Sequence, residues 1–319
     1  MKKNFFSIII PLYNKENFIV KTVNSVLNQT FQDFEIIIVE DCSTDTSKSI
    51  AYSIVSDKIK VIEHEKNKGL SASRNTGIKK ANSDFIVFLD ADDILKVNCL
   101  EKIYSLIDKF PSAGLYATNY EEVYAYTKKV QPTFSIKNKE FDCLIDDYFE
   151  ANLGQPIYSY SGVCIRKEVF ENVGYFDTNI TYGEDVDFNI RANLHYKLAY
   201  SFEPLVELIK FDTNQITNNG FWGKTIPDYD KYEKFSKENK NLKKFLDINR
   251  YMMANCYKKQ NDFTNFYKLK NSISKDPKIS GLNFKQRLLL NLPPNLLRFI
   301  SKIKQFFLNN GIPFNSYSK

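Results

Sequence analysis

Three aspartates crowd into four positions at the end of an apolar run. Residues 85–89 are hydrophobic, and Asp90, Asp92 and Asp93 follow them. Carboxylates this close repel one another unless a cation or hydrogen-bond donors compensate their charge. Oxygen ligands of this kind suit Mg²⁺ or Mn²⁺, which usually bind substrate phosphates as well. The simpler alternative is an acidic turn in which Asp93 caps a following helix.

A second acidic group lies at residues 182–188, where Glu184, Asp185 and Asp187 precede an apolar helical pattern. The dipole of a helix favours carboxylates at its N-terminus, so this group also has a purely structural explanation. Its chemical role can be judged only together with the rest of the chain.

The first third of the chain contains the elements that must position the aspartates. The predicted strands cover residues 6–10, 34–39, 59–63 and 85–89, and the predicted helices cover residues 17–28, 47–56 and 70–81. This alternation predicts a parallel α/β sheet. Right-handed crossovers bring the carboxyl ends of the strands to one edge, where ligands bind in open α/β folds. Residues 11–13, Asp41, Asp90 and Asp92 should therefore converge.

The segments at the strand ends narrow the kind of ligand. No Gly-x-Gly-x-x-Gly motif and no Walker phosphate loop comes after the first strand, which disfavours a dinucleotide. A nucleotide whose diphosphate is held through a metal fits better, because Tyr13 offers a flat face, Asp41 an acceptor and Arg74 a cation for phosphate or carboxylate. The alternative is that Tyr13 is an aromatic residue at the rim of the site without a role in binding, and that Arg74 is a charged residue on the surface of a helix.

Composition sets outer bounds on the protein. The chain has 319 residues, of which 43% are hydrophobic and 26% charged, values typical of a soluble globular protein. No apolar run approaches the roughly 18–20 residues of a membrane-spanning helix, and the short apolar run near the N-terminus lacks a signal-peptide cleavage site. The five cysteines are scattered, without metal-ligand or redox spacing, which indicates a reducing cytoplasm.

Charge separates the C-terminal third from the rest. From Asp230 to the end there are 19 Lys+Arg and 6 Asp+Glu, a balance of +13, which leaves 25 against 32, or −7, for the remainder. Helical periodicity covers residues 232–257, 262–273, 284–290 and 296–308. The last of these is amphipathic and basic, which is typical of a membrane-surface helix; the alternative is a helix packed on the main domain with a solvated basic face. No nucleic-acid-binding fold is recognisable, so nucleic acid is not expected as a partner.

Five segments in order resemble the family 2 inverting glycosyltransferases with the GT-A fold, of the type that builds bacterial surface polysaccharide or lipooligosaccharide. They are residues 7–14, 25–30, 37–45, 67–75 and 88–93, and the resemblance extends from about residue 6 to about residue 217. It implies a GT-A domain over residues 1–225, with a nucleotide-sugar-binding half at 1–112 and an acceptor and catalytic half at 113–225. Residues 226–319 would form a basic α-helical extension.

The resemblance also implies roles for single residues. The donor nucleotide would be held by Pro11, Tyr13, Asp41, Arg74 and Asp90, and the metal by Asp92. Asp185 would be the general base, with Glu184 beside it to orient the acceptor or its loop.

Three positions depart from the family pattern. Cys42 stands where Asp or Asn is usual, Lys210 where Arg is usual, and Asp212 where His is usual. We expect the uracil contact to persist through Asp41, and we take Asp212 as the replacement metal ligand, with a surface residue as the alternative.

These implications combine into one expected activity. The chain would be an inverting hexosyl- or N-acetylhexosaminyltransferase that uses Mn²⁺ or Mg²⁺ and moves a sugar from a UDP-sugar to a glycan or lipid-linked acceptor. It would be cytoplasmic and peripheral on the inner face of the cell membrane. The alternative is a sugar-nucleotide-binding or scaffold protein that has lost turnover.

Overall fold

The computed structural model describes residues 3–124, 128–132, 134, 136, 141–211, 221–310 and 312. These residues fall into two compact units. The N-terminal unit contains Met1–Glu122, Asn138–Asp146 and Tyr158–Asn214, and the C-terminal unit contains Val123–Lys137, Asp147–Ile157 and Gln215–Lys319.

The N-terminal unit is built on one mixed sheet, whose strand order is β3-β2-β1-β4-β9-β6-β10-β5. The first four strands in that order are parallel to their neighbours, and β9 joins β4 in the antiparallel direction. The strands are β1 (Phe6–Leu12), β2 (Phe34–Glu40), β3 (Ile59–Glu63), β4 (Phe85–Phe88), β5 (Ile94–Leu95), β6 (Leu115–Tyr124), β8 (Cys143–Leu144), β9 (Cys164–Arg166) and β10 (Leu198–Ile209).

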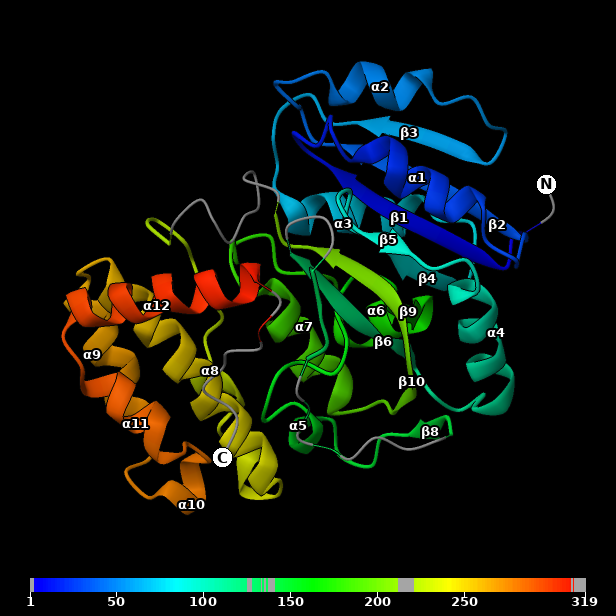
Figure 1. Cartoon of the computed structure of the whole chain (residues 1–319). Helices are drawn as coiled ribbons and strands as arrows, with labels where there is room; N and C mark the ends of the chain where they lie inside the picture. Colours follow the sequence, from blue (N-terminus) through cyan, green and yellow to red (C-terminus); the bar gives the residue numbers. More distant parts are fainter. Residues whose placement is uncertain are drawn as a thin grey trace. The chain divides into compact units, whose positions relative to one another are not determined.

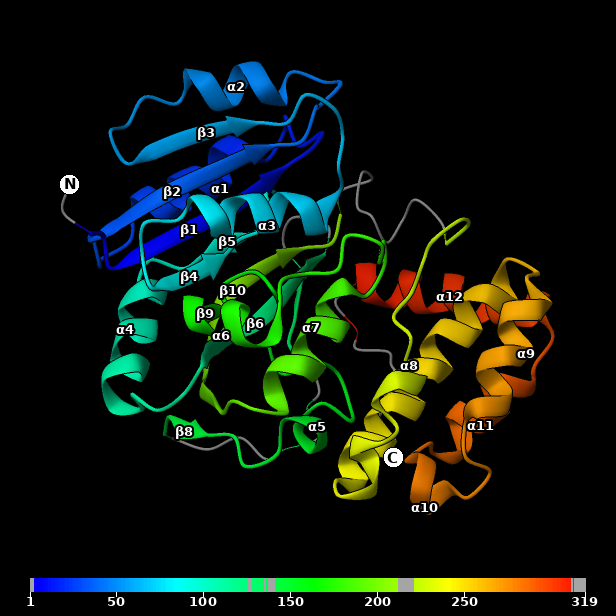
Figure 2. The ribbon, with the colours of Figure 1, turned by 180° about the vertical axis from the view of Figure 1, so that it is seen from behind.

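The central strand β1 is apolar on both faces, because helices cover the sheet on both sides. Ile8, Ile9 and Ile10 are fully buried. The helix α3 (Leu70–Lys80) packs so closely on β1 that a Cβ added to Gly77 would lie 2.4 Å from Cγ2 of Ile9. In Figure 1 helix α1 (Ile19–Leu27) lies in front of the sheet, and in Figure 2 helix α3 does.

The remaining helices of this unit are α2 (Ser47–Ser53), α4 (Cys99–Lys109), α6 (Lys167–Val173) and α7 (Glu184–Asn193). The predicted alternation of strands and helices in the first third of the chain is therefore confirmed. With β1, β2 and β4 parallel and adjacent, their carboxyl ends meet at one edge of the sheet.

Strand β6 extends to Tyr124, and a short strand, β7 (Lys128–Val130), follows it. The alternative interpretation of Asp93 as a helix cap is wrong, because Asp93 does not precede a helix. It precedes β5, and its carboxylate accepts the backbone N–H of Ile209 at 2.9 Å, a partner 116 residues away.

The C-terminal unit is mostly helical and is arranged around α8 (Lys240–Lys259), which contacts every other helix and 3₁₀ turn of the unit. These elements are α5 (Tyr148–Ala151), the 3₁₀ turns η1 (Asp230–Tyr232) and η2 (Phe235–Lys237), α9 (Phe263–Ser272), α10 (Pro277–Ser280), α11 (Phe284–Asn291) and α12 (Pro294–Asn309). The helices predicted from periodicity in this region are confirmed, with α8 starting eight residues later than predicted. No helix in the described part of the chain is both long and apolar enough to cross a bilayer.

Candidate active site

The predicted donor residues lie at the carboxyl edge of β1, β2 and β4. Pro11 is within β1 and pairs with Val39, and Tyr13 lies just beyond the strand with its ring exposed. Asp41 follows β2, and its N–H donates to Leu12 O at 2.9 Å, which ties the two strand ends together. The predicted convergence of strand ends is thus present in the structure.

Asp41 is buried and makes several hydrogen bonds within the chain. Its Oδ1 is 2.7 Å from Nδ1 of His64 and accepts the Lys68 N–H at 2.8 Å, while Oδ2 accepts the Gly69 N–H at 2.7 Å. Nε2 of His64 is in turn 2.9 Å from Oγ1 of Thr76 on α3. Asp41 therefore fixes the loop that leads into α3, and a base contact would be an additional task for it.

His64 was not singled out from the sequence, although a signal was present. It directly follows β3, so the rule that collects strand ends at one edge places it beside Asp41. Its N–H donates to Glu40 O at 2.9 Å, which continues the β2–β3 pairing by one residue.

Arg74 lies on α3 and is almost fully buried, so it is no surface charge. Nη1 donates to Oε1 of Glu184 at 2.9 Å, and Nη2 donates to Oδ1 of Asp90 at 3.1 Å. The guanidinium also lies 4.7 Å from the ring centroid of Tyr160. Arg74 thereby joins the two acidic groups that the sequence placed 94 residues apart (Asp90 and Glu184).

Burial and charge act in opposite directions on this arginine. Burial lowers the pKa of Arg74, but the carboxylates of Asp90 and Glu184 outweigh burial and the pKa is raised overall. The guanidinium is therefore always charged, and it compensates part of the negative charge at the sheet edge.

Glu184 and Asp185 start helix α7, after Gly183 in the left-handed region at φ 79°. Burial, with the neighbouring Asp185, raises the pKa of Glu184 to about 7, although Arg74 opposes the shift. Burial also raises the pKa of Asp185, whose Oδ1 accepts the Val186 N–H at 2.8 Å. Carboxylates with raised pKa values are better proton acceptors at neutral pH than ordinary ones.

Asp187, the third acidic residue of this turn, has a different role. It is buried and accepts from Nε of Arg191 at 3.0 Å, one helical turn further on. Arg191 also donates to the carbonyls of Val173 and Gly174. This pair anchors α7.

The three aspartates after β4 also have different hydrogen-bond partners. Asp90 faces Arg74, Asp92 accepts from Nζ of Lys15 at 2.7 Å, and Asp93 accepts from Oγ of Ser161 at 2.5 Å. Burial, with the charges of Asp92 and Asp90, raises the pKa of Asp93 well above its ordinary value. The sequence analysis did not identify Lys15 as a site residue, because its contact with Asp92 depends on the direction of its side chain.

The residues at this edge fit a divalent cation by donor type. Asp212, a predicted ligand, lies outside the described residues, and within the described ones no three His, Cys, Asp or Glu side chains gather closely enough to hold a metal. Mg²⁺ and Mn²⁺ are commonly held by one or two carboxylates together with substrate phosphates. Asp90 and Asp92, in one loop at the sheet edge, provide carboxylates of that type.

Comparison with known protein families identifies the family of this chain. Residues 7–174 match the family model of "Glycosyl transferase family 2", which is more than half of the chain. The chain belongs to glycosyl transferase family 2. The family predicted from the five sequence segments is therefore confirmed.

Two of the curated proteins that this chain resembles are bacterial glycosyltransferases. An uncharacterized glycosyltransferase, EpsJ of Bacillus subtilis, is 32% identical over 193 residues, which are 58% of this chain and 55% of EpsJ. WfgD of Escherichia coli, named as a UDP-Glc:α-D-GlcNAc-diphosphoundecaprenol β-1,3-glucosyltransferase, is 38% identical over 115 residues, 36% of this chain and 45% of WfgD. The matches span about half or less of the length of these relatives.

Solved structures show the same fold. S. aureus TarS 1–349 superposes with a TM-score of 0.56 at 19% identity, covering 84% of this chain and 90% of that chain. Its complex with UDP-GlcNAc gives a TM-score of 0.54 at 18% identity, covering 84% and 91%. At such identities the likeness shows the fold alone, and it confirms the predicted GT-A fold of this family 2 member.

Proposed function

We propose that this protein transfers a sugar from a UDP-activated donor to a glycan or lipid-linked acceptor in the synthesis of a cell-surface polysaccharide. The observation that carries the proposal is the bridge of Arg74 between Asp90 and Glu184, because it joins the predicted donor side and the predicted base side in one cluster. The family, the name of WfgD and the UDP-GlcNAc complex of TarS support the substrate class.

The donor nucleotide is assigned to the edge of β1, β2 and β4. We place the uracil ring against exposed Tyr13 and beside Pro11, with Asp41 as its polar partner. Asp90, which is 37% exposed at its side chain and held by Arg74, faces the sugar-diphosphate end. Arg74 then acts through Asp90 and Glu184, since both of its terminal nitrogens already donate to these carboxylates.

The proposed transfer is a single displacement. Asp185 removes the proton from an acceptor hydroxyl, whose oxygen attacks the anomeric carbon of the donor sugar. A glycosidic bond forms while the bond from that carbon to the diphosphate oxygen breaks, and UDP leaves with the electron pair. The configuration at the anomeric carbon inverts, and no covalent enzyme intermediate is required.

A divalent cation, Mn²⁺ or Mg²⁺, is part of the proposal. Asp92 would hold it together with the diphosphate, and Asp212, beyond the described residues, is the second proposed ligand. When bound, such a cation neutralises the negative charge that develops on the leaving diphosphate. Lys15 adds a fixed positive charge on Asp92 at the same place.

We also propose that the protein works at the inner face of the cell membrane, as a peripheral protein. The acceptor in the name of WfgD is linked to diphosphoundecaprenol, a lipid. The basic C-terminal third would be attracted to anionic lipids, as the balance of 19 Lys+Arg over 6 Asp+Glu from Asp230 onward indicates.

The first test is a binding and turnover panel of UDP and UDP-sugars with Mn²⁺, Mg²⁺ or a chelator. Asp185→Asn should lower turnover about 10²–10⁴-fold, the range for loss of a general base, while the affinity for UDP stays unchanged. Asp108→Asn, at an exposed position of α4, is the matched control and should leave both unchanged. Full turnover of Asp185→Asn would overturn the base assignment, and no binding of UDP under any condition would overturn the donor site.

A further inference from the structure

The helix α12 buries only a narrow strip of its surface. Leu297 and Leu308 are its buried apolar residues, and Leu308 packs with Tyr124 and Val130 of the same unit. Arg298 braces the helix, because Nε donates to Lys259 O at 2.7 Å and Nη2 donates to Oδ1 of Asn261 at 2.8 Å. The helix is thus fixed on the turn between α8 and α9, and its orientation about its own axis is set.

Large apolar side chains point away from that strip into solvent. Leu296, Phe299 and Phe306 are 42%, 60% and 66% exposed. With half-buried Ile303 they are spaced by three, four and three residues, so they lie on one face of the helix. Scattered exposed apolar residues are ordinary, but an aligned row with two phenylalanines on a fixed helix indicates a binding surface.

The segment of the chain that contains this row carries charges of one sign. From residue 277 to the end of the chain there are seven Lys and Arg and no Asp or Glu. Lys302 is exposed and lies one turn from both Phe299 and Phe306, so its aliphatic stem borders the apolar row. A partner that fits has an apolar interior and an anionic surface.

We propose that the exposed face of α12 (Leu296, Phe299, Ile303 and Phe306, with Lys302) docks the protein on an anionic lipid bilayer. The apolar row enters the boundary between headgroups and acyl chains, and Lys302 contacts lipid phosphates. This deepens the membrane contact of the proposed function by naming the surface, but it does not depend on sugar transfer, since lipid binding is measured without any donor.

A second copy of the chain is a poorer occupant. In a two-fold dimer the same face meets itself, so the lysines of both helices would be brought together. No carboxylate from residue 277 onward is available there to compensate them. A bilayer of anionic lipids instead supplies the missing negative charge over the whole face.

The test is co-sedimentation of the full chain with vesicles of phosphatidylcholine, alone or with phosphatidylglycerol, at low and high salt. We expect binding to the phosphatidylglycerol vesicles that weakens as salt rises. Phe299→Ser combined with Phe306→Ser should reduce partitioning at least about ten-fold, and Lys302→Gln about five-fold on anionic vesicles only. Phe141→Ser, at a similarly exposed phenylalanine of the N-terminal unit, is the matched control and should bind like the unchanged chain.

Each outcome supports or overturns the proposal. Because Phe299 and Phe306 are exposed, their replacement should leave the thermal midpoint unchanged, so a folding defect is recognised separately. Failure of the unchanged chain to bind any vesicle would overturn the proposal, as would equal binding by the double variant. A dimer that Phe299→Ser with Phe306→Ser dissolves, without vesicle binding, would assign the face to a second copy. UDP binding that persists in each of these cases would leave the proposed sugar transfer intact.

Discussion

Each unit has a buried arginine surrounded by carboxylates. The two clusters differ in how far the charges of the carboxylates are compensated. Arg74 is 2% exposed and Arg250 is 1% exposed, and the Nε of each has no acceptor within the described residues. Arg74 pairs with Asp90, which follows β4, and with Glu184, which starts α7. Arg250, on α8, pairs with three carboxylates near it in sequence, Asp230, Glu233 and Asp247.

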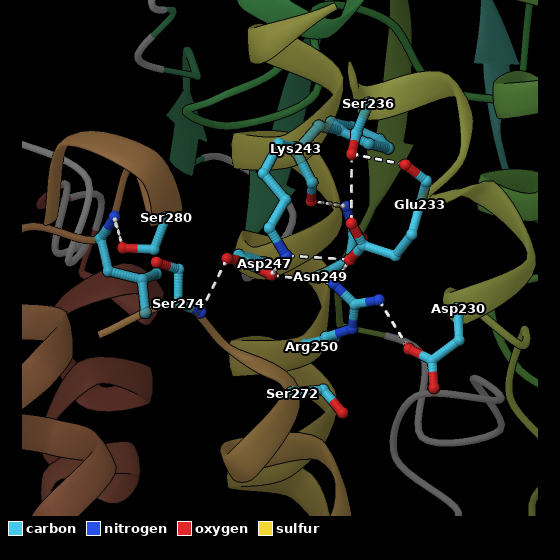
Figure 3. Close-up of polar contacts among 12 residues, drawn as sticks. Asp230, Glu233, Ser236, Lys243, Asp247, Asn249, Arg250, Ser272, Ser274 and Ser280 are labelled. Carbon is cyan, nitrogen blue, oxygen red and sulfur yellow. Dashed lines mark hydrogen bonds and ion pairs between the residues drawn. The ribbon is translucent and has the colours of Figure 1, made fainter. Parts of the chain in front are cut away.

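The cluster around Arg250 is closed, in the sense that its buried carboxylates are paired with donors inside the cluster. Figure 3 shows Asp247 surrounded by donors: Oδ1 accepts from Lys243 at 2.9 Å and from Arg250 at 2.8 Å, and Oδ2 accepts the Ser274 N–H at 3.0 Å. Burial acts to raise the pKa of Glu233, but Lys243 and Arg250 outweigh it, so that pKa is lowered overall. Lys243 and Arg250 thus compensate the two less exposed carboxylates, Glu233 and Asp247, while Asp230 is exposed to solvent. The network links α8 to η1 and to the chain after α9.

The cluster around Arg74 is open, in the sense that it has more carboxylates than its single arginine can compensate. One guanidinium faces Asp90, Glu184 and Asp185, and the pKa values of Glu184 and Asp185 are raised by burial in spite of it. Uncompensated negative charge in a buried cluster lowers the stability of the folded protein. Carboxylates with pKa values shifted in this way are found most often at functional sites. The comparison indicates that a buried arginine marks a site when its partners are left under-compensated, and a structural support when they are satisfied.

The largest expected effect is loss of the closed cluster. Arg250→Met should lower the free energy of unfolding by about 3–5 kcal/mol, because the buried carboxylate of Asp247 loses one of its two counter-charges. Urea unfolding followed by far-UV circular dichroism measures the change. Arg250→Lys, which keeps the charge, should recover part of it. A cost below about 1 kcal/mol for Arg250→Met would show that the closed network does not stabilise the C-terminal unit.

Next in size is the corresponding change in the open cluster. Arg74→Gln should lower turnover about 10²-fold or more, since Asp90 and Glu184 lose the group that orients them. Its cost in unfolding free energy should be smaller than that of Arg250→Met, about 1–2 kcal/mol, because Glu184 with a pKa near 7 can take up a proton and shed its charge. Parallel measurements of kcat and urea midpoints on both variants compare the clusters directly. Equal stability losses with unchanged kcat would erase the distinction.

The sequence predicted the frame of the open cluster because strand ends follow a simple rule. Parallel strands collect their carboxyl ends at one edge, so Asp41, Asp90 and Asp92 were placed there from position alone. The same rule, applied to β3, would have added His64. The bridge through Arg74 could not be predicted, since it depends on the direction of one side chain across 110 residues of sequence.

Asp93 and Arg250 show the limit more sharply. A local interpretation of Asp93 as a helix cap was wrong, because a backbone N–H 116 residues away satisfies the carboxylate instead. For Arg250 the periodicity of α8 correctly predicted a helix, but a charged residue on a helix reads as solvent-facing unless its partners are known. The spacing of Lys243, Asp247 and Arg250, all on one face, was the available signal.

A third effect concerns pH, and its sign should differ between the clusters. Burial raises the pKa of Glu184 from 4.5 to about 7, so the folded protein binds more protons than the unfolded chain between these values. Its contribution is fully present below pH 4.5 and is lost as pH rises through about 7, a change on the order of 3 kcal/mol. Glu184→Gln should therefore flatten the fall in stability that urea unfolding detects over this range.

Glu233 should behave in the opposite way, which gives this prediction its control. Its pKa is lowered overall, with Lys243 and Arg250 outweighing burial, so its stabilising contribution is present at neutral pH and is lost as pH falls below the ordinary range of a glutamate. Glu233→Gln should thus cost stability at neutral pH and little in acid. Identical pH profiles for Glu184→Gln and Glu233→Gln would contradict the contrast between an open and a closed cluster.

The smallest expected effect tests whether the open cluster extends to Lys15. In Lys15→Met the carboxylate of Asp92 loses its 2.7 Å partner, so the diphosphate of UDP meets more negative charge. With a chelator present, calorimetry should show UDP binding about five- to ten-fold weaker, with uridine binding unchanged. Lys21→Met, at an exposed position of α1, makes the same charge change away from the edge and should alter neither. If uridine and UDP weaken equally, Lys15 only holds the loop in place, and the open cluster ends at Asp90.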